Sequence, residues 1–159
     1  MEATCECRQV NEAEWQRTKH TWERRTFYRT SHGLLFHIPI GIAGAISKGM
    51  AGIKAKGYTL GEPFLMPTGE RGLFSADMPI AIQETPENDP NVVTWDRATL
   101  YSSYYHGPFR DMKRQADDLV SFVEKGEKRK PGKIYTWVTN CPRCWKRQGG
   151  PTTVILAAM

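Results

Sequence analysis

The sequence predicts an α+β fold in which a strand-helix-strand-strand unit occurs twice. Two apolar stripes have the helix period, runs of β-branched and aromatic residues flank them, and a proline-containing linker separates the halves. With 159 residues, 40% of them hydrophobic and 25% charged, the chain suits one domain with a buried core. We expect the duplicated units to form a pseudo-twofold antiparallel sheet with two helices on one face.

The first repeat is predicted at about residues 26–83, after a polar segment, residues 1–25, that we expect to be an arm or a first helix. Aromatic and β-branched residues predict a strand at 26–40. The next apolar residues are spaced by four, four and three positions, as on one face of a helix. These residues are Ile42, Ile46, Met50 and Ile53. Two strands follow around 63–67 and 78–83, joined by a glycine-rich turn.

Residues 84–91 are the clearest linker, because they combine two prolines with turn formers and hold no apolar side chain. The second repeat, about residues 92–159, opens with a strand that ends at a His-Gly-Pro sequence. An amphipathic helix follows, and its apolar face consists of Phe109, Met112, Ala116, Leu119 and Val123. Strands at 134–139 and 153–158 complete the repeat.

Hydropathy and charge disfavour several classes of protein. The longest apolar stretch, residues 33–46, is shorter than the roughly 20 apolar residues that a membrane-spanning helix needs. Residues 1–15 lack the apolar core of a secretory signal, so we expect a cytoplasmic protein. The net charge of +5 raises the question of nucleic acid, but the basic clusters are short and acidic residues interrupt two of their neighbourhoods. Nucleic-acid binding is therefore disfavoured.

The segment Tyr104-Tyr105-His106-Gly107-Pro108-Phe109 and the helix after it resemble the signature of the gyrase-inhibitor-like (GyrI-like) effector-binding domains. The duplicated element order is similar to theirs over about residues 27–159, and residues 36–41 carry an echo of the motif. The resemblance implies a central pocket for hydrophobic, often cationic, small molecules, and in some stand-alone members hydrolysis of strained electrophiles. No helix-turn-helix pattern is found, which favours a stand-alone member. The sequence departs from the family pattern at residues 135–145, so the family's acidic pocket residue is not assigned.

Strand alternation predicts an aromatic wall on the second repeat. Each face of the strand at 100–105 ends in a tyrosine, so one of Tyr104 and Tyr105 points away from the helix. Tyr135 and Trp137 share one face of a neighbouring strand, and the wall would suit a flat or cationic ligand. The alternative is a small hydrophobic cluster under a loop. The candidate ligand-binding residues are Tyr104, Tyr105, Phe109, Tyr135, Trp137 and His37.

His106 is a candidate general base, since an unperturbed imidazole titrates near ~6.5 and can take a proton at neutral pH. A hydrogen bond to the backbone is the structural alternative. A carboxylate against an aromatic wall would have a raised pKa and could protonate a substrate or activate water. Glu84, at the end of the strand at 78–83, is such a carboxylate unless it is simply solvated. The catalytic candidates are His106, Glu84 and Tyr104.

The four cysteines form two pairs, Cys5 with Cys7 and Cys141 with Cys144. Cys-X-X-Cys is typical of zinc knuckles and thiol redox motifs, and Pro142 tightens the turn of the second pair. A structural zinc site built from both pairs would hold the N-terminal arm on the domain. The alternatives are a disulfide or redox role for the second pair, and simple reduced thiols. A thioredoxin-like role is disfavoured, because residues 146–151 suggest a basic turn and no helix.

The leading hypothesis is a stand-alone domain that binds a hydrophobic or cationic small molecule, as a monomer or a homodimer. The alternative is a hydrolase that opens a reactive small molecule in the same pocket. A third hypothesis is a zinc- or thiol-dependent protein that acts through its cysteine pairs.

Overall fold

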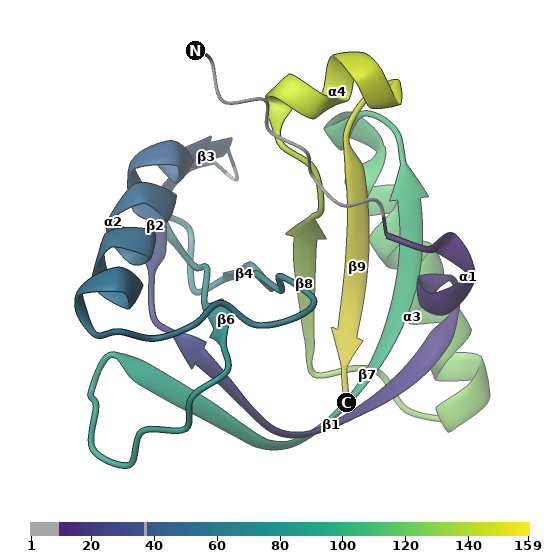
Figure 1. The fold of residues 1–159 in the computed structure, drawn as a ribbon. Coiled ribbons are helices and arrows are strands. Elements are labelled where there is room, and N and C mark those ends of the chain that lie inside the picture. Colours follow the sequence, from purple (N-terminus) through teal and green to yellow (C-terminus); the bar gives the residue numbers. More distant parts are fainter. Residues whose placement is uncertain (1–9, 37) are drawn as a thin grey trace. The chain divides into compact units, whose positions relative to one another are not determined.

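The computed structural model describes residues 10–36 and 38–159 (Figure 1). Over these residues it forms antiparallel sheets and four α-helices, so the predicted α+β class is confirmed. The chain divides into a first unit, with residues up to 21 and 99–159, and a second unit, residues 22–98. Strands β1 (Thr18–Tyr28) and β7 (Val92–His106) each contribute residues to both units.

In the first unit, β9 (Thr152–Ala158) lies between β7 and β8 (Lys133–Val138) and is antiparallel to both. Tyr104 is opposite Val154, which in turn is opposite Trp137, so these three side chains share one face of the sheet. The adjacent strand positions alternate to the other face. The register therefore separates a face with Tyr104 from a face with Tyr105.

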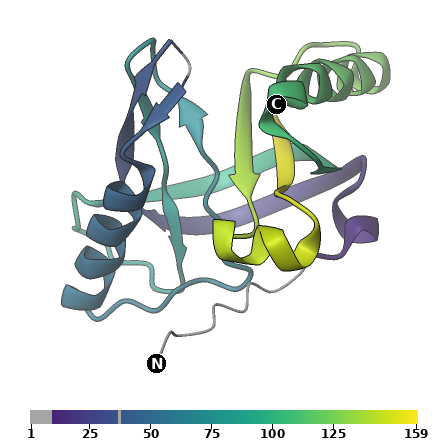
Figure 2. The ribbon, with the colours of Figure 1, turned by 90° about the horizontal axis from the view of Figure 1, so that it is seen from above.

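The face with Tyr105 is covered by α3 (Met112–Glu127), which follows the short 3-10 helix η1 (Phe109–Asp111). Leu119 and Val123 of α3 are buried against β9, as the predicted amphipathic stripe requires. Figure 2 shows α3 and α1 (Glu12–Trp15) on opposite sides of the strands. Burial of each such aliphatic side chain stabilises the fold by roughly 1.5–3 kcal/mol.

A helix that the sequence pattern did not predict, α4 (Pro142–Gln148), connects β8 to β9. Cys141 is its N-cap, and Pro142 occupies the first helical turn, where its fixed φ suits a helix. Gly149 ends the helix with φ 77° and donates its N–H to the Trp145 carbonyl. The prediction of a turn in place of a helix after Cys144 is wrong, because these end signals define a short helix without an apolar stripe.

The second unit has a four-stranded sheet in the order β3-β2-β5-β4, and β6 pairs with β1. Helix α2 (Ile42–Ala55) begins where the spacing predicts, and its Ile53 is buried in the core of this unit. The strand predicted at 26–40 is broken into three, partly because Phe36 adopts a left-handed φ of 49°. The shorter strands of this unit are β2 (Ser31–Leu35), β3 (Ile38–Ile40), β4 (Gly69–Glu70), β5 (Ser75–Asp77) and β6 (Ile80–Ile82).

The element order of the two halves differs from a simple duplication. From β7 onward the chain follows the predicted strand, helix, strand, strand order with α4 inserted, whereas three strands precede α2 in the first half. Strand β1 begins at Thr18, inside the segment expected to be an arm or helix. The pseudo-twofold relation stays a prediction. Within the described ranges, no helix combines the length and apolar character needed to cross a membrane.

Candidate functional site

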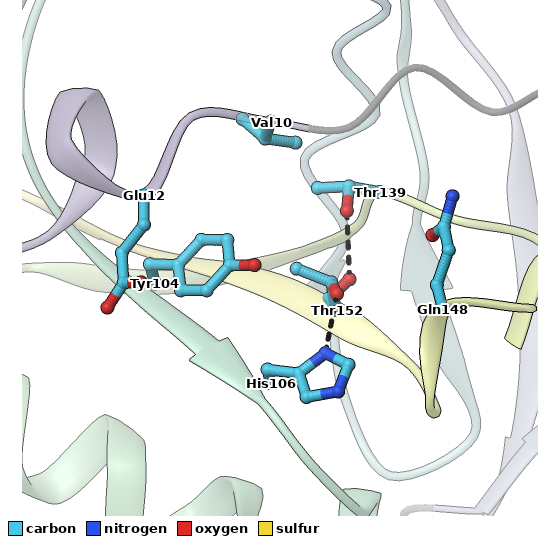
Figure 3. Close-up of a pocket in the computed structure, with 7 residues that line it drawn as sticks. All are labelled: Val10, Glu12, Tyr104, His106, Thr139, Gln148 and Thr152. Atoms are coloured by element: carbon cyan, nitrogen blue, oxygen red, sulfur yellow. Dashed lines mark hydrogen bonds between the residues drawn. The ribbon is translucent and has the colours of Figure 1, made fainter.

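A pocket of about 360 Å³ lies in the first unit, where β7 and β8 end and β9 begins (Figure 3). Its lining is mainly polar and comes from the N-terminal segment, the three strand ends and α4. The lining residues are Val10, Glu12, Tyr104, His106, Thr139, Gln148 and Thr152. Hydroxyl, imidazole, carboxylate and amide groups therefore surround a space that is large enough for a small molecule.

Strand geometry explains why His106 and Tyr104 both line the pocket. They are two positions apart on β7, so their side chains leave the same face. His106 is paired with Thr152, and its Nδ1 lies 3.0 Å from the Thr152 hydroxyl. Thr139 donates its N–H and its hydroxyl to the Thr152 carbonyl, at 2.9 and 3.1 Å. These bonds fix the strand ends beneath the pocket.

Tyr104 presents its phenol to the pocket (Figure 3). Its backbone N–H is held by the Gln16 amide oxygen at 2.8 Å, and no described residue hydrogen-bonds its hydroxyl. Glu12 lies beside this tyrosine in Figure 3 and is exposed. Asn11 caps α1 by accepting the Ala13 N–H at 3.1 Å, which defines the helix that begins at Glu12. The pocket lining thus includes the Tyr104 phenol, whose hydroxyl points toward Thr139 and Thr152 in Figure 3, and Glu12, whose carboxylate lies at the backbone end of this tyrosine.

A buried asparagine, Asn140, connects α4 to β9 below the pocket. Its Nδ2 donates to the Gln148 side chain at 2.8 Å and to the Gly150 carbonyl at 3.0 Å. Its Oδ1 accepts the Thr152 N–H at 2.9 Å and the Trp145 indole N–H at 3.1 Å. All four hydrogen-bonding positions of the amide are occupied, so Asn140 sets the placement of Gln148 and Thr152.

The predicted aromatic wall corresponds to an aromatic cluster that is partly buried. The sequence predicted that one of Tyr104 and Tyr105 shares a sheet face with Tyr135 and Trp137, and in the structure this residue is Tyr104. Trp137 is only 4% exposed, because the edge of Trp15 packs against it at a centroid distance of 5.3 Å. The His20 ring packs against Trp15 in a tilted arrangement, with the ring centroids 4.6 Å apart. Tyr104 therefore reaches the pocket, while Trp137 forms part of the core beside it.

Three other predicted ligand-binding residues lie outside the pocket lining. The Tyr105 hydroxyl donates to the Pro108 carbonyl at 3.0 Å, on the sheet face that α3 covers. Phe109 packs edge-on against Trp145 at 5.6 Å. The Lys133 ammonium lies 5.1 Å from the centre of the Tyr135 ring. His37 lies outside the described residues.

Glu84 belongs to the second unit and has a structural role there. Both of its carboxylate oxygens accept the Thr59 N–H, at 2.9 and 2.7 Å. This backbone hydrogen bond lowers the pKa of Glu84, so the raised pKa expected for a pocket acid is not found. Its carbonyl also accepts the Thr26 hydroxyl at 2.6 Å.

Cys141 and Cys144 lie at the start of α4, with their sulfur atoms 3.7 Å apart. Within residues 10–36 and 38–159, no group of three or more histidine, cysteine or acidic side chains is arranged to hold a metal ion. Cys5 and Cys7 lie outside the described residues, so the zinc site built from four cysteines stays a prediction.

Sequence reasoning missed the pocket roles of Glu12, Thr152 and Gln148. Thr152 could have been found from antiparallel pairing, since the residue opposite His106 follows once the strand register is known. Gln148 depends on α4, whose proline and glycine end signals were present. Glu12 gives no local signal, because its segment is far in sequence from β7.

The α+β fold of this chain is similar to that of solved proteins at low sequence identity. The C-terminal domain of EcmrR matches with a TM-score of 0.69 at 14% identity, over 91% of this chain and 98% of that one. The structure of EcmrR in a DNA complex matches with a TM-score of 0.64 at 15% identity, over 90% of this chain and 56% of that one. A hydrolase from Listeria innocua matches with a TM-score of 0.57 at 12% identity, over 91% of this chain and 93% of that one. At these identities the likeness shows the fold, and it confirms the predicted GyrI-like resemblance.

The family is shown by a separate comparison. The model of the family described as "Bacterial hydrolase" matches residues 1–159, and the chain belongs to this family. No curated protein matches the chain.

Proposed function

We propose that this protein is a hydrolase that opens a reactive small molecule in the pocket beside Tyr104 and His106. The observation that carries the proposal is the convergence of proton-transferring groups on a pocket of about 360 Å³. A volume of this order suits a small organic ligand. The family description supports hydrolysis, and the polar lining supports it better than a purely aromatic binding site. The fold alone does not decide the chemistry.

His106 is the proposed base. When its Nδ1 donates a hydrogen to Thr152 Oγ1, its Nε2 keeps a lone pair and can take a proton from water. The water oxygen then bonds to the electrophilic carbon of the ligand as the bond from that carbon to its leaving atom breaks. The Tyr104 phenol donates its proton to the leaving atom. His106 afterwards returns a proton to the tyrosinate through solvent, which restores both groups.

Glu12 gives the proposed site a preference for charge. Its carboxylate is at the pocket and carries a negative charge at neutral pH, so it attracts cationic ligands and repels anionic ones. Neutral electrophiles would be affected little. The two roles predicted for Glu84, protonating the substrate and activating water, belong in this proposal to Tyr104 and His106.

Hydrolysis of an activated ester, p-nitrophenyl acetate, and of a strained ether, styrene oxide, tests the proposal. His106→Gln and Tyr104→Phe should each lower kcat by about 10²–10⁴-fold, the usual range for loss of a general acid or base. Tyr105→Phe is the matched control, because the Tyr105 hydroxyl lies on the other sheet face. Its removal should leave kcat unchanged. Equal losses in all three variants, or no hydrolysis of either compound, would contradict the proposal.

A second candidate is binding without turnover, which the aromatic cluster favours. Trp15 and Trp137 lie on the same sheet face as Tyr104, so a cationic aromatic dye in the pocket should quench tryptophan fluorescence. Ethidium is a suitable probe, and anionic fluorescein is its control. Glu12→Gln should weaken ethidium binding and leave fluorescein unaffected or bound more tightly. Saturable quenching with no product from either test substrate would favour this function over hydrolysis.

A further inference from the structure

The cysteine pair of α4 has a geometry that suits disulfide formation. Cys141 and Cys144 are three residues apart across the first turn of the helix, and their sulfur atoms are separated by 3.7 Å. A disulfide bond is about 2.05 Å long, so a modest rotation of the two side chains brings the sulfur atoms together. Pro142 favours the helical start that keeps both side chains on one side.

The two sulfur atoms differ in access. Cys144 is fully buried, whereas Cys141 is partly exposed. The Arg147 guanidinium lies 3.4 Å from the Cys144 sulfur, where it would stabilise a thiolate. An external reagent therefore reaches Cys141, and Cys144 is placed to react only with its neighbour.

The pair is connected to the pocket through Asn140, the residue before Cys141. Its amide is bonded to Gln148, Gly150 and Thr152, and two of these residues line the pocket. Gln148 is also the last residue of the helix that Cys141 caps. A change of backbone at the start of α4 would therefore act first on the hydrogen-bond partners of Asn140, of which Gln148 and Thr152 line the pocket.

We propose that Cys141 and Cys144 form a redox-active dithiol that exchanges with low-molecular-weight disulfides, and that closing its disulfide changes ligand binding in the pocket. The Cys141 thiolate attacks one sulfur of glutathione disulfide, which releases one glutathione and leaves a mixed disulfide. The Cys144 thiolate then attacks the Cys141 sulfur and releases the second glutathione. Two electrons pass from the pair to the reagent, and the two cysteine protons end on the released thiols. The effect on the pocket rests on the proposed function.

Peptide mass spectrometry of the full chain in glutathione buffers tests the exchange, with free thiols alkylated before digestion. The peptide with both cysteines should form an internal disulfide in oxidising buffer. Cys144→Ser should keep a glutathione adduct on Cys141. In Cys141→Ser, the adduct on Cys144 should form at least about tenfold more slowly than the adduct on Cys141 forms in Cys144→Ser. Similar adduct rates at the two positions, or no internal disulfide, would overturn the exchange. Peptides with Cys5 and Cys7 are scored separately.

Ethidium titration of the reduced and oxidised protein tests the effect on the pocket. The dissociation constant should change by about fivefold or more between the two states, the usual lower range for coupled sites. The double variant Cys141→Ser, Cys144→Ser should lose this difference while it still binds ethidium. Equal affinity in both states would overturn the coupling. A protein that neither binds ethidium nor hydrolyses p-nitrophenyl acetate would refute the proposed function and the coupling together, while the exchange is decided by mass spectrometry.

Discussion

Replacing Asn140 gives the sharpest test of the structure beneath the pocket. The side chain is 5% exposed and makes four hydrogen bonds, two as donor and two as acceptor. Asn140→Ala removes the hydrogen-bond partner of the buried Thr152 N–H and of the Gly150 carbonyl. Trp145 keeps a bond to the backbone carbonyl of position 140 at 3.0 Å, and Gln148 is only partly buried.

The expected cost follows from the number of stranded groups. Each buried polar group left without a partner costs about 1–3 kcal/mol, so two partly compensated groups give roughly 2–4 kcal/mol. For a protein of this size 1 kcal/mol shifts Tm by about 2–4 °C, which predicts a fall of about 4–16 °C. The exposed Asn88→Ala is the matched control and should stay within about 0.5 kcal/mol of wild type.

Asn140→Asp separates hydrogen bonding from volume, since it keeps the shape of the side chain. At neutral pH the new carboxylate faces the Gln148 oxygen and the Gly150 carbonyl, both acceptors, so its pKa in the folded state is raised. A raised folded pKa means that the stabilising form is present below the unfolded pKa and is lost as pH rises. The variant should therefore be less stable than wild type at pH 7 and recover part of the difference near pH 4.

Urea denaturation at these two pH values, followed by tryptophan fluorescence, measures both effects. A variant that loses as much stability at pH 4 as at pH 7 would refute the assigned orientation of the amide. Wild-type stability of Asn140→Ala would refute the hydrogen-bond network itself.

Three further predictions concern stability elsewhere in the chain. Lys128 ends α3 with φ 59°, so Lys128→Gly should raise stability by about 0.5–1 kcal/mol in urea denaturation, and a loss would contradict the left-handed backbone. The hydrogen bond from the Tyr101 hydroxyl lowers the pKa of Glu127, so the contribution of Glu127 to folding stability is present above its unfolded pKa and is lost as pH falls. Glu127→Gln should therefore flatten the acid side of the curve of stability against pH. An unchanged acid side would contradict this role of Glu127. Hydrogen bonding to Asp89 at 2.6 Å raises the pKa of Tyr58 to about 12. This stabilisation is complete below pH 10 and is lost as pH rises from 10 to about 12. Ultraviolet titration should show a late phenol that disappears in Tyr58→Phe.

Helices were predictable where packing and periodicity agree. Leu119 and Val123 bury a stripe that the residue spacing displays, and α2 likewise begins at Ile42. The helix α4 was missed because its seven residues carry no apolar stripe, and its stability depends on Cys141, Gly149 and tertiary bonds to Asn140. Periodicity does not detect an element that is defined by its ends.

The candidate site was predictable only in part, for a similar reason. Tyr104 and His106, which line the pocket, could be singled out because strand alternation and a turn after the strand are local patterns, and their roles in the site stay a prediction. Glu84 was chosen for its strand-end position, but a backbone N–H 25 residues away occupies its carboxylate. Glu12 was missed because its segment is distant in sequence from β7.

The distribution of hydrogen bonds also predicts where the ligand of the proposed function would lie in the pocket. The oxygens of Thr152 are engaged, since its carbonyl accepts two bonds from Thr139 and its hydroxyl is bonded to His106. A ligand gains little from groups that must first break such bonds, whereas a group bonded only to water exchanges one hydrogen bond for another. The Tyr104 phenol, the Glu12 carboxylate and His106 Nε2 make no hydrogen bond to another described residue. The polar atoms of the proposed ligand should therefore lie near these three side chains, with the threonines serving as their support.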